Sequence, residues 1–388
     1  MSRKEIPAQL TERRIRLVWV HIRRAAQETY PSTGSRLAMT KKTPAYGARA
    51  AKAALAPMTI ERRDPGSHDV EIEILYCGIC HSDVHKVNDD WGTTHFPVVP
   101  GHEIVGRVLS LGASASRFRE GDLVGVGCIV DSCRTCPECR AGREMFCVEG
   151  VTFSFDSLER DGQNWTYGGY TANMVVDEHY VVRVPKGLDP ARAAPLMCAG
   201  ITTYSPLRQF GCKRGDQVAV VGLGGLGHMV VKFGASMGAD VTVLSGSRDK
   251  EKDAARLGAK RFVATKEPGA LEALEGTFDL IVDTVSAPHD LNMQLTLLRN
   301  FGTMVLVGLP PASTPLDAAM LIHGNRRLAG SNIGGIPETQ EMLDYCGKHG
   351  VVADVELITA KQINDAYARM ERGDVHYRFV IDGASFGA

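Results

Sequence analysis

Residues 217–228, QVAVVGLGGLGH, lead through an apolar segment to DVTVLSGSR at 240–248, and this stretch decides the fold. The β-branched run before Gly222 predicts a strand, and the apolar segment after Gly227 predicts a helix. Between them lies the G-x-G-x-x-G turn that binds the pyrophosphate of a dinucleotide, made of Gly222, Leu223, Gly224, Gly225, Leu226 and Gly227. Gly222 makes the turn, Gly224 lets backbone amides approach the phosphates, and Gly227 lets the helix pack on its strand. The N-terminus of that helix attracts negative charge, so the stretch predicts a βαβ unit that binds a dinucleotide.

The end of the second predicted strand, Val241–Leu244, indicates which dinucleotide is bound. An NAD-binding unit usually carries Asp or Glu there, about 20 residues past the glycines, to hold the ribose 2′-hydroxyl. Here the strand leads instead into two hydroxyls and two cations that suit a 2′-phosphate: Ser245, Ser247, Arg248 and Lys250. The alternative is that both cations are solvated residues in the first turn of the next helix. We predict NADP(H) rather than NAD.

The composition is that of a soluble protein long enough for two domains, with 388 residues, 44% hydrophobic and 23% charged. A net charge of −1 gives no support for nucleic-acid binding. No apolar run approaches the ~20 residues of a membrane span. Residues 1–38 differ, because they carry eight Lys or Arg against three Glu. Their apolar run is too short for a signal peptide and their acids oppose a transit peptide, so we interpret 1–38 as a disordered basic extension.

The order of predicted elements divides the remaining chain. Residues 55–188 hold short strands separated by long loops, with strands expected at 70–74, 104–109 and 123–130. From Asp189 strands and helices alternate, with strands expected at 217–221, 240–244, 261–264, 278–283 and 303–308. That order is typical of a parallel, doubly wound sheet. We expect the C-terminal tail, with a helix over 337–348 and strands over 355–358 and 377–381, to rejoin the first unit. The predicted fold class is α/β, with a mainly β catalytic domain over 39–188 and 335–388 and a Rossmann domain over 189–334.

Four cysteines share the spacing C-x2-C-x2-C-x7-C: Cys133, Cys136, Cys139 and Cys147. Four thiolates this close suit a closed tetrahedral zinc site, whose role is structural because no coordination position stays open. The rival is an iron–sulfur site, but the bacterial spacing ends in C-x3-C-P, which is absent here. Clustered cysteines also favour a reducing compartment over disulfides.

A second, dispersed set holds two cysteines and a histidine, the kind of set that binds catalytic zinc with one position open: Cys80, His102 and Cys198, with Glu103 beside them. Each has a plainer interpretation, such as a buried small side chain for Cys198. No spacing rule joins the three. The remaining cysteines are interpreted as structural: Cys77, Cys128, Cys212 and Cys346.

Several motifs together resemble the zinc-dependent medium-chain dehydrogenase/reductase superfamily, in its cinnamyl-alcohol-dehydrogenase-like branch, which includes bacterial broad-range NADPH-dependent aldehyde reductases. They are GICHSDVH, PGHEIVGRV, the four-cysteine spacing, PLMCAGITTYSPL, VGLGGLGHM and SNIGGIPETQEML. The resemblance runs from about Ala45 to the C-terminus. It implies a GroES-like catalytic domain and a Rossmann domain with the active site between them.

Carried over residue by residue, the resemblance assigns roles to the motif positions. Cys80, His102 and Cys198 would hold a catalytic zinc, with Glu103 as an occasional fourth ligand, and the four-cysteine cluster would hold a structural zinc. Ser82 and His85 would form a proton relay, and Asp83 would orient the ligand imidazole. Cofactor contacts would come from the glycine turn, from Ser245, Ser247, Arg248 and Lys250, and from Ser331 and Ile333. Gly246 stands where many members have Ser, which removes one possible partner of the phosphate.

The implied function is reversible hydride transfer between NADP(H) and a primary alcohol or aldehyde, working chiefly as a reductase of broad aldehyde range. The alternatives are a zinc-free quinone or enone reductase of the same superfamily and a non-catalytic NADP-binding protein. Expected cofactors are NADP(H) and two Zn²⁺ per chain. A cytoplasmic homodimer is expected, with a small aldehyde or alcohol as substrate and neither nucleic acid nor membrane as partner.

Overall fold

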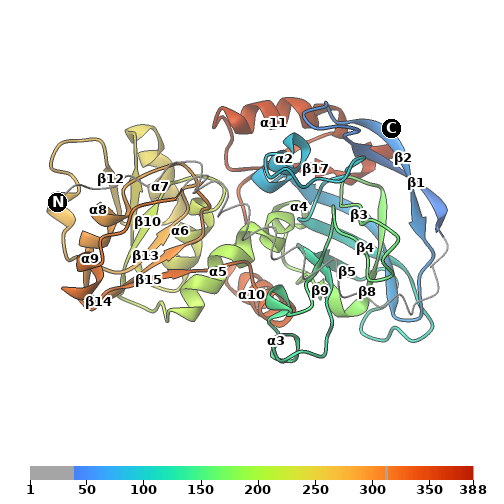
Figure 1. Cartoon of the computed structure of the whole chain (residues 1–388), viewed down its shortest axis with the longest axis horizontal. Helices are drawn as coiled ribbons and strands as arrows, with labels where there is room; N and C mark the ends of the chain where they lie inside the picture. The colour runs from blue at the N-terminus through green and yellow to red at the C-terminus, as the bar shows by residue number, and fades with distance from the viewer. Residues whose placement is uncertain (1–38, 311–312, 388) are drawn as a thin grey trace, which may run out of the picture.

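The structure is a computed structural model that describes residues 39–310 and 313–387, so the predicted extension at 1–38 lies outside it. Two sheets of different kinds organise this part of the chain, one of six strands and one of seven. Figure 1 shows them in separate lobes, with α5 and α10 between the lobes. Within the described residues, no helix combines the length and the apolar character that crossing a bilayer requires.

The six-stranded sheet is parallel throughout, in the order β12-β11-β10-β13-β14-β15. Its strands are β10 (Gln217–Val221), β11 (Asp240–Ser245), β12 (Arg261–Ala264), β13 (Phe278–Asp283), β14 (Leu298–Leu306) and β15 (Arg327–Gly330). The helices that accompany this sheet are α6 (Gly227–Ser236), α7 (Glu251–Leu257), α8 (Leu291–Thr296) and α9 (Ala319–Ile322), and α5 (Ala199–Gln209) lies between the lobes (Figure 1). The central strands are apolar runs, as expected for a sheet covered on both faces. The predicted doubly wound unit is therefore confirmed, although β14 begins earlier than expected.

The seven-stranded sheet has the order β16-β17-β3-β4-β5-β9, and β8 also pairs with β3. Its strands are β3 (Asp69–Gly78), β4 (Ile104–Leu111), β5 (Leu123–Val126), β8 (Asn173–Asp177), β9 (Val181–Arg183), β16 (Val355–Ile358) and β17 (Arg378–Asp382). Since β17 pairs antiparallel with β3, the C-terminal tail does return to the first sheet. The strand expected at 123–130 is two strands, β5 and β6 (Ile129–Asp131), which belong to different sheets. The exact domain limits stay a prediction.

Smaller elements complete this lobe. They are β1 (Met39–Gly47), β2 (Ala56–Arg63), β7 (Thr152–Phe153), α2 (His81–Asn88), α3 (Pro137–Arg140), α4 (Pro190–Ala193), α10 (Ile336–His349) and α11 (Ile363–Glu371). Strand β3 differs from its sequence pattern, which alternates apolar residues with acids and suggests one wet face. Glu73 is exposed, but Glu71 is buried, paired with Lys41 and accepting a hydrogen bond from the Ser110 hydroxyl at 3.0 Å. A buried carboxylate needs such partners.

Candidate active site

Three segments that are distant in sequence bring the dispersed ligand set together. Cys80 lies just before α2, His102 and Glu103 lie just before β4, and Cys198 lies just before α5. One ligand atom from each of these four residues falls within 4.8 Å of the others. All four side chains are buried, with Cys80 at 9% exposure and Glu103 at 0%. Two thiols and an imidazole at this separation are the donor set that binds catalytic zinc.

Asp83 connects the elements that carry two of these ligands. Its Oδ2 accepts from the Cys80 backbone N–H at 2.8 Å, and its Oδ1 lies 3.0 Å from His102 Nδ1. Oδ1 also accepts from the Gly101 N–H at 3.0 Å. Gly101 has φ +108°, and a Cβ there would lie 2.7 Å from the Gly169 nitrogen, so the approach to His102 requires glycine. The carboxylate thus directs Nε2 of His102 toward the thiols.

Arg378, which sequence reasoning missed, links the ligand set to the glycine turn. Its guanidinium pairs with the Glu103 carboxylate, and both side chains are at most 4% exposed. A Cβ at Gly225 would lie 2.9 Å from Nη1 of Arg378. Within the described residues, Oε2 of Glu103 has no hydrogen-bond partner, which leaves it free to face a cation. The sequence signal that could have revealed this link is an arginine within a largely apolar C-terminal strand, RFVID at 378–382.

Cys128 also lies closer to the site than its sequence context suggests. The neighbouring Cys198 thiol, and after it the charge of His102, lowers the pKa of Cys128. The hydrogen bond from Cys198, followed by the charge of Arg378, lowers the pKa of Cys80 despite its burial. At Cys80 these surroundings favour thiolate, the form that binds metal, whereas the neighbouring thiols of Cys128 and Cys80 raise the pKa of Cys198.

The predicted proton relay lies along α2. The Ser82 hydroxyl is 3.9 Å from the Cys80 sulfur, and His85 lies one turn further along the helix. Nδ1 of His85 is 2.7 Å from Oδ2 of Asp90, and both side chains are about two-fifths exposed, at 42% and 41%. The indole of Trp91 packs against the imidazole with ring centroids 5.4 Å apart. Asp90 was not predicted, because an exposed acid in a loop carries no sequence signal.

The four-cysteine cluster forms a compact lobe. The four sulfur atoms lie within 4.8 Å of one another. Backbone N–H groups point at three of them: Cys136 N to Cys133 Sγ at 3.3 Å, Cys139 N to Cys136 Sγ at 3.4 Å and Cys133 N to Cys147 Sγ at 3.4 Å. The Cys139 N–H is the largest cause that lowers the pKa of Cys136, to about 6. Donors aimed at sulfur stabilise thiolates, so the lobe fits a closed zinc site.

Glu144 fastens this lobe to α10 and was also missed from the sequence. Its side chain is 1% exposed, and its Oε2 accepts from the Ile336 N–H at 3.0 Å. A Cβ at Gly335 would lie 1.7 Å from the Gly142 carbonyl oxygen, so the two segments are in close contact. The lobe therefore supports the loop that carries Ile333.

The glycine turn has the predicted geometry. Gly222 has φ +85°, and a Cβ at Gly227 would lie 2.1 Å from the Gly222 carbonyl oxygen. A Cβ at Gly224 would meet none of the described atoms within 4 Å, so the backbone there is open to a ligand. The turn stands at the carboxyl end of β10 and at the N-terminus of α6. A pyrophosphate fits such a cradle.

The residues expected to hold a 2′-phosphate surround the end of β11. Ser245 ends that strand, and Nζ of Lys250 donates to the Leu223 carbonyl at 2.9 Å, beside the glycine turn. Arg248 is turned to other partners, since its Nε and Nη2 donate to the two carboxylate oxygens of Glu267 at 2.6 and 2.7 Å. The sequence did not predict this pairing.

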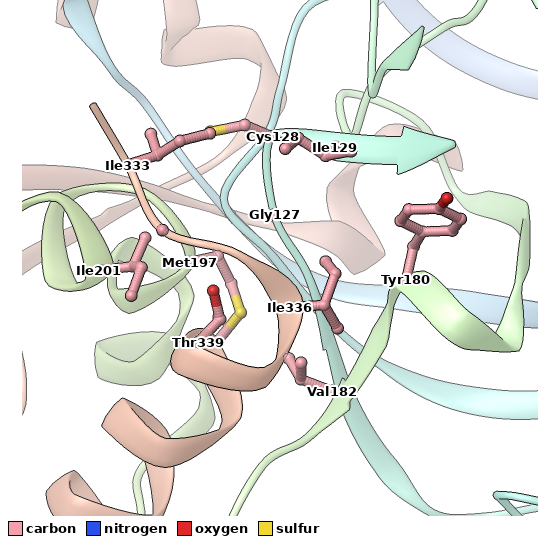
Figure 2. Close-up of a pocket in the computed structure, with 11 residues that line it drawn as sticks. Gly127, Cys128, Ile129, Tyr180, Val182, Met197, Ile201, Ile333, Ile336 and Thr339 are labelled. Carbon is pink, nitrogen blue, oxygen red and sulfur yellow. The ribbon is translucent and has the colours of Figure 1, made fainter. Parts of the chain in front are cut away.

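The loop that carries Ser331 and Ile333 borders a small apolar pocket. Ile333 has φ +29°, which costs energy for a β-branched residue and is typical of functional loops. Figure 2 shows its side chain and that of Cys128 beside each other at one end of the pocket. The lining is mainly apolar: Gly127, Cys128, Ile129, Tyr180, Val182, Met197, Ile201, Ile333, Gly334, Ile336 and Thr339. The metal-ligand candidates are not part of that lining, although Met197 adjoins Cys198 in sequence.

Comparison with known families and structures agrees with this geometry. Residues 66–186 match the alcohol dehydrogenase GroES-like domain, and residues 225–348 match the zinc-binding dehydrogenase family. The chain is 54% identical over 338 residues to NADP-dependent alcohol dehydrogenase C of Mycobacterium tuberculosis. The matched region covers 87% of this chain and 97% of that relative. It is 52% identical over 344 residues to aldehyde reductase YahK of Escherichia coli, and the matched region covers 88% of this chain and 98% of YahK.

Solved structures agree as well. A cinnamyl alcohol dehydrogenase of Sorghum bicolor matches with a TM-score of 0.86 and 43% identity, covering 89% of this chain and 98% of that one. The CAD of Helicobacter pylori complexed with NADP(H) matches with a TM-score of 0.83 and 40% identity, covering 88% and 98%.

Proposed function

The chain belongs to the zinc-binding alcohol dehydrogenase family, and from this premise we propose that it is an NADP(H)-dependent alcohol dehydrogenase that works chiefly as an aldehyde reductase. The observation that carries the proposal is the link made by Arg378. This one side chain contacts Glu103, in the zinc-ligand set, and approaches Gly225, in the dinucleotide turn. A dinucleotide held at that turn would therefore lie beside the proposed zinc site, as hydride transfer to a metal-bound carbonyl requires.

The residues present suit both groups. Cys80, His102 and Cys198 would hold a zinc ion, which would supply a Lewis acid for the carbonyl oxygen, while NADPH would supply the hydride. Glu103, with one carboxylate oxygen unpartnered among the described residues, serves as the occasional fourth ligand. Cys133, Cys136, Cys139 and Cys147 hold a second, structural zinc, so the proposal requires two metal ions per chain.

The chain's own residues orient the reaction and handle its proton. Asp83 accepts from Nδ1 of His102, which fixes the tautomer that presents Nε2 to the metal. Ser82 donates the proton that the product oxygen requires. His85 lies half-exposed on the same helix, where its imidazole can exchange protons with solvent and so restore that of Ser82. Asp90 holds the ring by its Nδ1.

His85→Ala is expected to slow aldehyde reduction at neutral pH by roughly tenfold to a hundredfold, because the relay is then cut off from solvent. Steady-state rates, together with elemental analysis of the same samples, test this. The zinc content should stay at the wild-type value. Loss of zinc would show that His85 is a ligand, and an unchanged rate would remove it from the relay.

The residues at the edge of the site bear on cofactor choice. Ser245, Ser247 and Lys250, with Arg248 nearby, support a 2′-phosphate and therefore NADP(H), and Ser331 and Ile333 would contact the nicotinamide side. The broad aldehyde range is proposed from the family resemblance, because the small apolar pocket is not lined by the metal-ligand candidates.

We also propose a cytoplasmic homodimer. Strand β15 ends the six-stranded sheet, and large apolar side chains on segments near it stay exposed: Phe301 at 64%, Leu309 at 60% and Ile322 at 71%. Such side chains beside a sheet edge favour a contact with a second copy. The cysteines of the described residues are free thiols, which suits a reducing compartment.

A panel of aliphatic and aromatic aldehydes, each measured with NADPH and with NADH, tests the function. We expect turnover of several aldehydes, benzaldehyde and cinnamaldehyde among them, with NADPH strongly preferred. Absence of turnover with every aldehyde would favour a non-catalytic protein, and equal use of the two cofactors would overturn the NADP assignment.

A further inference from the structure

We propose that Lys266 is a specificity-determining residue that binds the 2′-phosphate of NADP(H) from the loop after β12. The inference rests on the proposed function and refines its cofactor site. Lys266 lies outside the motifs that predict cofactor binding, twenty residues beyond Gly246 in the chain.

The sheet places Lys266 beside the end of β11. Strands β11 and β12 are parallel and in register, with Ser245 opposite Ala264. The Thr265 N–H then donates to the Ser245 carbonyl at 2.7 Å, so the loop after β12 begins alongside the predicted phosphate site. Because the carboxyl ends of parallel strands meet at one edge, the next side chain lies over the same surface.

The position of Lys266 relative to Gly246 supports the inference directly. A Cβ at Gly246 would lie 3.4 Å from Cε and 4.0 Å from Nζ of Lys266. A serine side chain at 246 would therefore be in van der Waals contact with the end of the Lys266 side chain. Gly246 offers no hydroxyl to a phosphate, but the ammonium group of Lys266 lies beside the position that a serine side chain would occupy. A cation binds phosphate more strongly than a neutral hydroxyl does.

The other cations around this surface are already engaged. Arg248 donates to both oxygens of Glu267 and also to Glu251 at 3.2 Å, so its charge is offset by two acids. Lys250 donates to the Leu223 carbonyl. Within the described part of the chain, Lys266 makes neither a hydrogen bond nor an ion pair, and its side chain is exposed. Its ammonium group can therefore meet an incoming anion without breaking an existing interaction.

Isothermal titration calorimetry of the purified full chain with NADPH, NADH and 2′,5′-ADP separates the phosphate contact from the rest of the cofactor. Lys266→Ala should weaken binding of NADPH and of 2′,5′-ADP by about tenfold, the effect expected for one charged hydrogen bond near the surface. NADH binding should stay within about twofold of wild type, because NADH lacks the phosphate. Lys266→Glu should weaken NADPH binding further, and Lys266→Arg should keep it.

Two further variants make the test specific. Gly246→Ser combined with Lys266→Ala should recover part of the NADPH affinity that Lys266→Ala removes, since the serine supplies a hydroxyl beside the position of the lost ammonium group. Lys260→Ala is the matched control, because Lys260 pairs with Asp240 at the opposite end of the same two strands. It should leave all three affinities unchanged.

The outcomes distinguish this inference from the proposed function. If wild type prefers NADPH but Lys266→Ala binds NADPH as tightly, the role of Lys266 is wrong and the NADP assignment stands. If the variant loses NADH affinity equally, Lys266 is structural and the inference is again overturned. If wild type binds NADH as well as NADPH, the NADP assignment itself fails and the inference fails with it.

Discussion

Replacing Cys80 by alanine is expected to remove the catalytic zinc and to slow aldehyde reduction by roughly a thousandfold or more, the cost of losing several kcal/mol of carbonyl activation. Cys80 is one of two buried thiols in the ligand set. Without it, His102 and Cys198 remain as ligands with Glu103 as an occasional one, and zinc then binds weakly. The fold should survive, because the backbone N–H of residue 80 still donates to Asp83. Elemental analysis and NADPH oxidation measured on the same sample test this.

Cys128→Ala is the matched control for that variant. Cys128 also contacts Cys198, but the group of ligand atoms within 4.8 Å contains Cys80, His102, Glu103 and Cys198. The control should therefore keep two zinc ions per chain and most of the activity. Zinc loss in Cys128→Ala would show that Cys128 is a ligand, and full activity in Cys80→Ala would remove Cys80 from the site.

Replacing Cys139 by serine is expected to release the structural zinc and to lower the free energy of unfolding by about 3 kcal/mol or more. The four-cysteine lobe has a core made of little besides its own cysteines and Val151, so metal bonds replace apolar burial there. Zinc content should fall from two ions to one, and the thermal midpoint should fall with it.

The consequences of that variant for activity follow from Glu144. Glu144 joins the four-cysteine lobe to Ile336, and the loop before Ile336 carries Ile333, which is proposed to contact the cofactor. We therefore expect a raised KM for NADPH as well as lower stability. Cys212→Ser is the control, because Cys212 is half-buried and lies outside the four-cysteine lobe. This variant should keep both zinc ions and the wild-type thermal midpoint. An unchanged midpoint in Cys139→Ser would mean that the lobe is stable without metal.

The features that were predictable from the sequence are local ones. The glycine turn needs backbone conformations and close approaches that only glycine allows, so Gly222 and Gly227 mark it in the sequence itself. The four-cysteine spacing likewise places its ligands within one short segment. The dispersed set followed from the family motifs, since no spacing rule relates Cys80, His102 and Cys198.

The features that were missed depend on contacts between distant segments. Arg378 reaches Glu103 across 275 positions of sequence, and Glu144 reaches Ile336 across 192. Arg248 is the opposite case, a residue whose sequence position suggested a partner that it does not meet. Its position suits a phosphate, but Glu267, from another loop, pairs with its guanidinium. A residue's type and neighbours in sequence indicate which chemistry is available to it, but the fold decides which partner it meets.

The most direct test of the central claim is NADPH oxidation with cinnamaldehyde by the purified wild-type protein, before and after removal of metal by a chelator. The hydride is proposed to reach a carbonyl activated by zinc at Cys80, His102 and Cys198. We therefore predict rapid NADPH-dependent reduction that is abolished by chelation and restored by added Zn²⁺. Reduction that continues at the same rate in metal-free protein would contradict this account and would indicate a zinc-free reductase.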